Sequence, residues 1–232
     1  GVPLVNIQTP NGAGVSRNAY SQFDVQRDGA ILNNATQSVQ TALGGWVQAN
    51  PLLNRSASVI VNEVNSSDPS LLRGHVEVAG PRAQVIIANP SGITCDGCGF
   101  INAHRATLTT GVPQYGASGT LDSYLVRRGS VSFTGDGLNA GSTDFTDVLA
   151  RAVQVNAAMH AQQLRVVAGS NDVDAGSLQA RHALPGHQRI RVFQRRDHAR
   201  DAGGHQRIAA RRRAAMMAAG FKRDVDSRAT HV

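Results

Sequence analysis

The two cysteines of the chain, Cys95 and Cys98, are the residues most suited to metal or redox chemistry, and they lie in the stretch NPSGITCDGCGF. A structural zinc site needs four ligands, usually two such pairs, whereas this pair has only His104 nearby. A thioredoxin-like pair normally opens a helix in a βαβ unit, and the surrounding sequence has no such pattern. A disulfide is compatible with the spacing, because the ends of a tight turn over Asp96-Gly97 lie within about 7 Å.

Carboxylates and basic residues could support catalysis if they converged on one face, as in a polysaccharide lyase or hydrolase. The candidates are scattered through the sequence: Glu63, Glu77, Asp96, Asp122 and the pair Arg127-Arg128. His75 and His104 have no nucleophile or carboxylate at motif spacing. Since isolated charged residues are mostly exposed, we expect these to be solvated surface positions. We therefore predict no catalytic residues, no metal and no cofactor.

Two Asn-Pro pairs predict rigid corners of the backbone, and they begin the stretches Asn50-Pro51-Leu52-Leu53 and Asn89-Pro90-Ser91-Gly92-Ile93. Proline fixes its own φ and pushes the preceding asparagine towards extended geometry, and the asparagine side chain can bond the backbone two residues on. Gly92 permits a positive φ, and Ile93 returns to the core. Such residues usually serve the turn itself, and a contact with another protein is the alternative.

The elements that position these turns are short β-strands. Only 4% of the residues are aromatic and 24 are glycine, which favours many strands joined by turns. Strands are predicted at residues 2–7, 58–64, 75–78, 84–88, 106–109, 130–133, 152–155 and 164–167. A sandwich, a barrel and a parallel solenoid fit this spacing. The solenoid fits best, because Asn and Gly punctuate every strand and two-residue hairpins are scarce, although no repeat has a fixed period.

The charge of the chain is unevenly distributed and divides it into two regions. Residues 1–175 carry 10 arginines and 12 acidic residues, whereas residues 176–232 carry 12 arginines, one lysine and 4 aspartates. All 14 asparagines lie in the first region, and five of the eight histidines lie in the second. We predict a folded domain over residues 1–175 and an Arg/Ala/His-rich tail over residues 176–232.

Three interpretations of the tail compete. A basic arm for nucleic acid would need aromatic side chains between the arginines, and the tail has only Phe193 and Phe221. A disordered extension, helical in part over residues 208–221, is the second. The third, which we favour, is a shifted reading frame, since a GC-rich gene read out of frame tends to yield Arg, Ala, Gly and His. We therefore predict no nucleic-acid partner.

Four segments of the first region carry a family resemblance: NIQTPNGAGVSRNAYSQFDV at 6–25, ILNNA at 31–35, ANPLLNRSASVIVNEVNSSDPSLLRGHVEVAGPRAQVIIANPSGITCDGCGFINAHRATLTTG at 49–111, and FTDVLARAVQVNAAMHAQQLRVVAGSNDV at 145–173. They resemble the secretion domain of two-partner secretion exoproteins, the N-terminal module of filamentous haemagglutinins and of contact-dependent growth inhibition effectors. The resemblance covers residues 2–175.

This resemblance implies a right-handed parallel β-helix with an N-terminal cap. It also implies export to the periplasm of a Gram-negative bacterium, recognition there by a partner outer-membrane transporter of the Omp85 type, and delivery to the cell surface or the medium. The family has signature turns of the forms NPNL and NPNGI, and this chain departs from them at Leu52 and Ser91. Further haemagglutinin repeats would follow Asp174, so the change of composition there suggests a truncated product.

By this resemblance the candidate transporter-recognition residues are Asn50, Pro51, Asn89, Pro90 and Gly92. Because the implied compartment is oxidising, we favour a disulfide between Cys95 and Cys98 over a metal or redox role. The function expected is a non-enzymatic secretion and targeting domain of an adhesin or growth-inhibition toxin, with a transporter as partner and no small-molecule substrate. The alternative is a β-helical carbohydrate-active enzyme, which a convergent cluster of carboxylates would favour.

Overall fold

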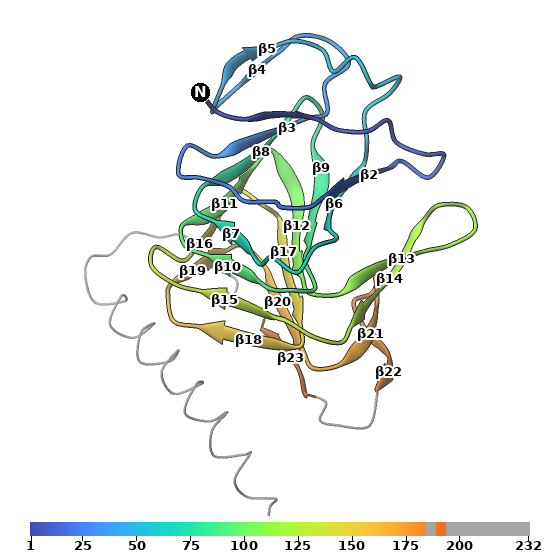
Figure 1. Cartoon of the computed structure of the whole chain (residues 1–232), viewed down its shortest axis with the longest axis vertical. Coiled ribbons are helices and arrows are strands. Elements are labelled where there is room, and N and C mark those ends of the chain that lie inside the picture. The colour runs from blue at the N-terminus through green and yellow to red at the C-terminus, as the bar shows by residue number, and fades with distance from the viewer. Residues whose placement is uncertain (184–188, 194–232) are drawn as a thin grey trace, which may run out of the picture. The chain divides into compact units, whose positions relative to one another are not determined.

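The computed structural model describes residues 1–183 and 189–193, all within the first of two units of the chain, Gly1–Arg196. Every regular element of these described residues is a β-strand. None of them forms a helix long and apolar enough to cross a membrane. Figure 1 shows most of the strands stacked as successive turns of one coil.

Three sheets form the sides of this coil. The seven-stranded sheet consists, in spatial order, of β2 (Val15–Tyr20), β6 (Val59–Val64), β9 (Ala83–Ala88), β12 (Ala103–Thr109), β17 (Phe145–Ala150), β20 (Leu164–Ala168) and β23 (Arg189–Phe193). The six-stranded sheet consists of β1 (Leu4–Asn6), β3 (Ala30–Asn33), β8 (His75–Ala79), β11 (Cys98–Ile101), β16 (Leu138–Ala140) and β19 (Met159–Ala161). The four-stranded sheet consists of β18 (Ala152–Val155), β15 (Ser130–Phe133), β10 (Ile93–Cys95) and β7 (Ser70–Leu72).

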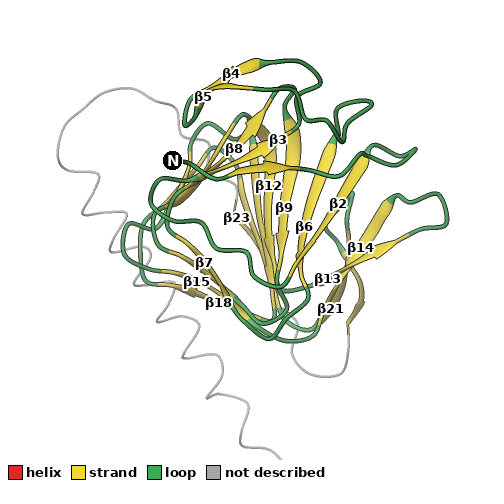
Figure 2. Cartoon of the chain, turned by 45° about the horizontal axis from the view of Figure 1, so that its top comes forward, coloured by secondary structure: helices red, strands yellow, loops and turns green. Residues whose placement is uncertain are grey.

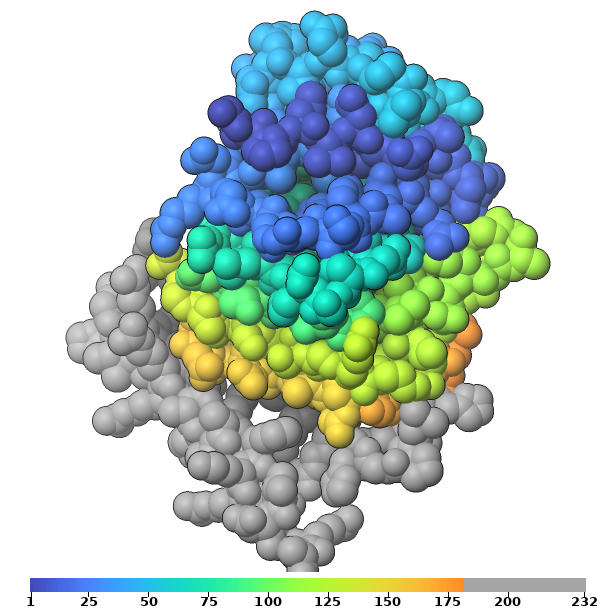
Figure 3. Space-filling model, viewed as in Figure 1, coloured from blue at the N-terminus to red at the C-terminus, as the bar shows by residue number. Residues whose placement is uncertain are grey.

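The chain visits the three sheets in a fixed rotation. After β6 in the seven-stranded sheet it passes through β7 and then β8, and the next circuit of β9, β10 and β11 stacks on the first. Neighbouring strands pair in parallel, and β23, which pairs antiparallel with β20, is the exception within these sheets. In the space-filling view the circuits form bands in sequence order (Figure 3). The prediction of a parallel β-helix is confirmed.

Aliphatic side chains fill the inside of the coil in rows. Ile60, Val85, Ala106 and Thr146 occupy one row of the seven-stranded sheet, so successive circuits advance by 25, 21 and 40 residues. The first three of these side chains are fully buried in the main core. Unequal circuits explain why the sequence shows no fixed repeat, because the turns vary in length while the rows stay in register.

A fourth sheet, called the outer sheet below, covers the outside of the seven-stranded sheet. It consists of β13 (Val112–Tyr115), β14 (Leu121–Val126), β21 (Asn171–Asp174) and β22 (Ala180–Ala183), all paired antiparallel. Tyr124 and Val126 of β14 are buried with Val61, Ile86 and Leu149 of the coil. The covered strands are therefore buried on both faces, which accounts for apolar runs such as VII in β9.

A two-stranded hairpin, β4 (Val39–Thr41) and β5 (Gly45–Val47), lies at the N-terminal end of the coil, at the top of Figures 1 and 2. Its tip is anchored by Glu77, whose carboxylate accepts hydrogen bonds from the backbone nitrogens of Ala42 (2.6 Å) and Leu43 (2.8 Å). The expectation that Glu77 is a solvated surface residue is therefore wrong. It is buried because these two backbone donors satisfy its charge in place of water.

The sequence located eight strands, and two of them, residues 130–133 and 152–155, agree with β15 and β18 to the residue. Three-residue strands such as β7, β10 and β16 lay below the length that a pattern can reveal. β22 and β23 lie beyond residue 175, and the domain boundary placed there stays a prediction. The remainder of the tail lies outside the described residues.

Candidate functional site

The Asn50 turn is a corner whose asparagine is turned inward. The Asn50 side chain is 2% exposed, and its Nδ2 donates to the carbonyl oxygens of Ile7 (2.9 Å) and Asn33 (2.8 Å). Its Oδ1 accepts from the backbone nitrogen of Leu52 at 2.9 Å, and the Leu53 nitrogen donates to the Asn50 carbonyl at 3.1 Å. The asparagine thus fastens its own turn and two neighbouring segments of the coil, as expected of an Asn-Pro corner.

The Asn89 turn repeats this arrangement in the middle of the stack. Asn89 is fully buried, and its Nδ2 donates to the carbonyl of Asp68 (2.9 Å) and to the hydroxyl of Ser70 (3.0 Å). Its Oδ1 accepts from the Ser91 nitrogen at 2.9 Å, and the Gly92 nitrogen donates to the Asn89 carbonyl at 3.0 Å. Gly92 has a φ of 123°, the left-handed region that the sequence anticipated for this position.

The two turns differ in what they present to solvent. Pro51 is exposed and Leu52 is 47% exposed, which makes Leu52 one of the few large apolar side chains at the surface of the described residues. Pro90 and Ser91 are half-buried, and the Ser91 hydroxyl donates to the Ser66 carbonyl at 3.0 Å. A partner that meets the folded domain can therefore touch Pro51 and Leu52, whereas the side chains of the two asparagines are out of its reach.

Cys95 and Cys98 are joined by a disulfide in the structure, with their Cα atoms 5.2 Å apart. Cys95 ends β10 and Cys98 begins β11, so the bond bridges the corner formed by Asp96 and Gly97. Both cysteines lie in the main core, at 0% and 1% exposure. No metal ion could use this pair as free thiolate ligands while the bond is intact. The redox state of the pair in the cell stays a prediction.

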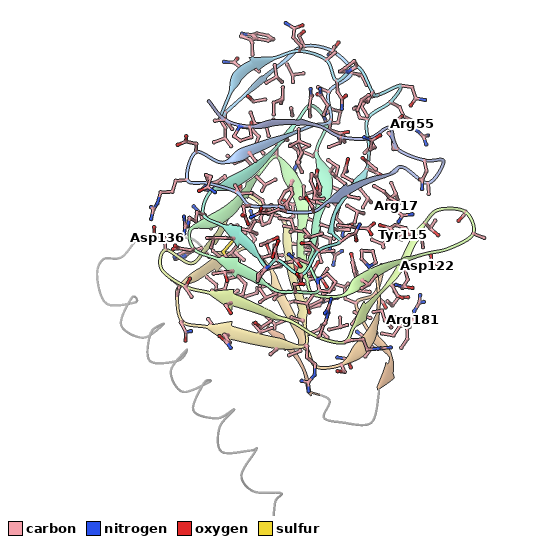
Figure 4. All side chains as sticks on the ribbon, in the orientation of Figure 1. Arg17, Arg55, Tyr115, Asp122, Asp136 and Arg181 are labelled. Atoms are coloured by element: carbon pink, nitrogen blue, oxygen red, sulfur yellow. A yellow bond between two sulfur atoms is a disulfide. The ribbon has the colours of Figure 1, made fainter. Side chains whose placement is uncertain are left out.

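The remaining acidic candidates have separate partners: Asp96 accepts the backbone nitrogen of Asp136 at 3.3 Å, and Asp122 accepts the hydroxyl of Thr120 at 2.8 Å. Glu63 accepts the hydroxyl of Tyr115 and pairs with Arg17, whose Nε lies 3.4 Å from it, while the Arg17 guanidinium stands 3.8 Å from the centre of the Tyr115 ring. Burial, and next the Glu63 carboxylate, raise the pKa of Tyr115, so its phenol stays neutral. Figure 4 shows Arg17 and Tyr115 together at the base of the β13–β14 hairpin, with Asp136 on the opposite side of the coil.

A partly buried ion pair lies beneath the outer sheet. Arg105 Nε is 2.6 Å from the carboxylate of Asp147, whose side chain is 3% exposed. Tyr124 packs above it, and burial, followed by the charge of Asp147, raises the pKa of this phenol. Because Asp147 faces the outer sheet rather than a groove, we assign the pair to holding the two layers together. Within residues 1–183 and 189–193, no group of three His, Cys, Asp or Glu side chains is arranged to hold a metal ion.

Sequence reasoning did not single out two further asparagines, buried Asn34 and half-buried Asn102, that act like the two signature residues. Asn34 donates to the carbonyls of Ala57 and Pro81, both at 3.0 Å, and Asn102 donates to those of Val78 and Gly80, both at 2.7 Å. Asn102 also has a φ of 57°. Their partners are distant in sequence, so the available signal was the abundance of asparagine near predicted corners. Asparagine therefore serves throughout this coil as a corner fastener.

The family model of the TPS secretion domain matches residues 1–222 of this chain. The chain belongs to the TPS secretion domain family. The resemblance drawn from its sequence is thereby confirmed, and the chain is a secretion and targeting domain. The signature turns and the N-terminal hairpin described above are thus features of a secretion domain.

Relatives and solved structures agree with this membership. The chain is 57% identical over 176 residues to Toxin CdiA of Yersinia pestis and 52% identical over 178 residues to tRNA nuclease CdiA of Escherichia coli (strain STEC_O31), in each case over 75% of this chain. It spans 5% and 6% of the length of those two relatives. The crystal structure of the filamentous hemagglutinin secretion domain matches with a TM-score of 0.73 and 38% identity, over 81% of this chain and 64% of that one.

Proposed function

We propose that this secretion domain is the non-enzymatic targeting module of a secreted Gram-negative exoprotein. It passes through the periplasm, where the periplasmic domains of a partner outer-membrane transporter recognise it before the rest of the exoprotein crosses to the cell surface. The observation that carries the proposal is that both signature turns of the family are ordered corners of one β-helix, and that one of them presents Pro51 and Leu52 to solvent.

The five candidate recognition residues divide into two roles under this proposal. Asn50, Asn89 and Gly92 are buried, so they act by fixing the shape of the turns. Pro51, together with Leu52 beside it, makes direct contact with the transporter, and half-buried Pro90 contributes at most the rim of such a contact. An exposed leucine on a rigid turn is suited to this purpose. Binding removes its apolar surface from water, and no conformational entropy is lost in ordering a flexible loop.

A carbohydrate-active enzyme receives no support from the acidic residues. Glu77 is tied to the hairpin cap, Glu63 to Arg17 and Tyr115, and Asp147 to Arg105. Retaining and inverting glycosidases need two carboxyl groups that face one another across a bound sugar. We infer that the segment shared with the toxin and tRNA nuclease relatives serves export rather than the activities in their names, because it is only 5–6% of their length.

Secretion of the full chain in cells that carry its cognate transporter tests this proposal. We expect Leu52→Ser to lower the secreted fraction by about tenfold, which corresponds to a loss of about 1.4 kcal/mol of binding. Val155→Ser is the matched control, since Val155 is 44% exposed on β18, far along the stack from the Asn50 turn. The urea midpoints of both purified variants should equal that of the wild type. Normal secretion of Leu52→Ser, or an equal loss for Val155→Ser, would contradict recognition through this turn.

A further inference from the structure

The disulfide lies inside a circuit that is covered on both sides. In the four-stranded sheet, Cys95 pairs with Leu72 of β7 in the preceding circuit and with Phe133 of β15 in the following circuit. In the six-stranded sheet, Cys98 pairs with Leu138 of β16, which belongs to the same following circuit. Phe133 and Leu138 are fully buried. The sulfur atoms are therefore enclosed by the circuits that precede and follow them in the stack.

The turn of the covering circuit closes the corner itself. The Cys95 Sγ lies 3.1 Å from the carbonyl oxygen of Gly137, and this oxygen also accepts the backbone nitrogen of Gly97 at 2.9 Å. The Thr134 nitrogen donates to the Cys95 carbonyl at 2.9 Å. With Cys95 at 0% exposure and Cys98 at 1%, no thiol or disulfide reagent has a path to either sulfur while residues 130–140 are in place.

We propose that the Cys95–Cys98 bond forms in the unfolded chain, before residues 130–140 stack, and that folding then seals it against exchange. Thiol–disulfide exchange requires a thiolate to approach a sulfur atom directly through a mixed-disulfide intermediate. Once residues 130–140 are stacked, a thiolate cannot reach the sulfur atom of either cysteine. Wherever the bond is present, its oxidation therefore preceded completion of the β-helix, and the folded domain preserves whichever redox state the chain had when the circuit closed.

The step is an exchange with a disulfide-bearing oxidant. The two cysteine thiols lose two protons and two electrons as the S–S bond forms, and the oxidant's own disulfide is reduced to two thiols. Cys95 and Cys98 are separated by three positions in the sequence, so their thiols meet readily in an unfolded chain. If the proposed function holds, the class of reaction that precedes outer-membrane passage is thiol oxidation in the periplasm. The order of oxidation and folding does not depend on that function.

Reduction kinetics of the purified, oxidised full chain test the seal. With dithiothreitol in native buffer, the rate of thiol release should be more than about tenfold slower than for the same chain in denaturant, because reduction must wait for the circuit to open. The rate in denaturant is first corrected with a model peptide disulfide for the effect of denaturant on the reagent. Phe133→Ala should speed native reduction, since it weakens the covering circuit. Val155→Ala, in the next circuit of the same row, should leave it unchanged. Native and denatured rates within tenfold of each other would overturn the proposal.

Oxidation of the reduced chain tests the order directly. The full chain is unfolded, reduced, returned to native buffer without an oxidant, and then given oxidised glutathione. If the reduced chain folds, we expect disulfide formation more than about tenfold slower than in the unfolded chain. If it does not fold until oxidised, the required order is supported as well. Oxidation of the folded, reduced chain at the rate of the unfolded chain would overturn the proposal. Neither assay involves the transporter, so failure here is distinct from failure of the secretion test.

Discussion

The Asn50 and Asn89 turns have the same local chemistry and different positions in the stack. In both, a buried asparagine makes two side-chain donations to neighbouring segments and accepts the nitrogen two residues on. The Asn89 turn has complete circuits on both sides, whereas the Asn50 turn lies next to the N-terminal hairpin. The same motif therefore only stabilises the backbone at Asn89, in the interior of the coil. At Asn50, near the end of the coil, it also presents exposed side chains to a partner.

The largest difference between the turns should be in stability. Asn89→Ala removes three hydrogen bonds from a fully buried site, and at roughly 1 kcal/mol each we expect a loss of about 3 kcal/mol in the free energy of unfolding. Asn50→Ala removes as many, but water can reach the end of the coil and replace some of them, so we expect about 2 kcal/mol. Urea denaturation of both variants measures this. A larger loss for Asn50→Ala would reverse the proposed contrast.

Gly92 and Leu53 occupy the same position of the two turns and differ in backbone conformation. Gly92 has a φ of 123°, and a Cβ there would lie 3.3 Å from the carbonyl oxygen of Ser130 in the next circuit. We expect Gly92→Ala to cost about 1–2 kcal/mol, because an L-residue is strained in that region. Leu53→Gly, by contrast, relieves or creates no backbone strain; it should lose the packing of a half-buried side chain and add the conformational entropy of a glycine to the unfolded chain. An unchanged urea midpoint for Gly92→Ala would show that the turn relaxes freely.

The smallest effect is expected at the third residue of each turn. Ser91→Ala removes one hydrogen bond to the Ser66 carbonyl, which should cost about 0.5–1 kcal/mol. Leu52→Ala should leave the free energy of unfolding within about 0.5 kcal/mol of the wild type, since an exposed side chain packs against little. Thermal unfolding resolves this difference if the two variants are compared in one experiment. A clear destabilisation by Leu52→Ala would mean that this residue serves the fold.

Sequence patterns located the corners better than the strands. The Asn-Pro pairs, the Asp-Gly turn between the cysteines and the positive φ of Gly92 were all read from local chemistry, because each depends on residues within four positions of one another. The outer sheet could not be read in this way. Its strand β14 pairs with β21, which lies some fifty residues later in the chain. That pairing exists because the outer face of the coil is apolar at Val61 and Ile86 and must be covered.

The burial of charged residues could not be predicted from local sequence either. Glu77 and Asp147 were indistinguishable in sequence from surface carboxylates, yet both are buried. The partners that make burial tolerable come from elsewhere: the hairpin tip for Glu77 and Arg105 of the preceding circuit for Asp147. A buried charge is stable only when such partners are supplied in three dimensions, and no spacing within the strand encodes them.

The sequence by itself determined the class of fold, the family and the places where the coil turns, since these follow from composition and from motifs whose atoms are neighbours along the chain. Only the tertiary structure decided which turn residues a partner can touch and which atoms are enclosed. Leu52 and Ser91 occupy the same position of two similar turns, and Cys95 and Cys98 lie only a few residues from Ser91. Their exposures differ because exposure depends on the circuits that stack above and below, which the local sequence does not contain.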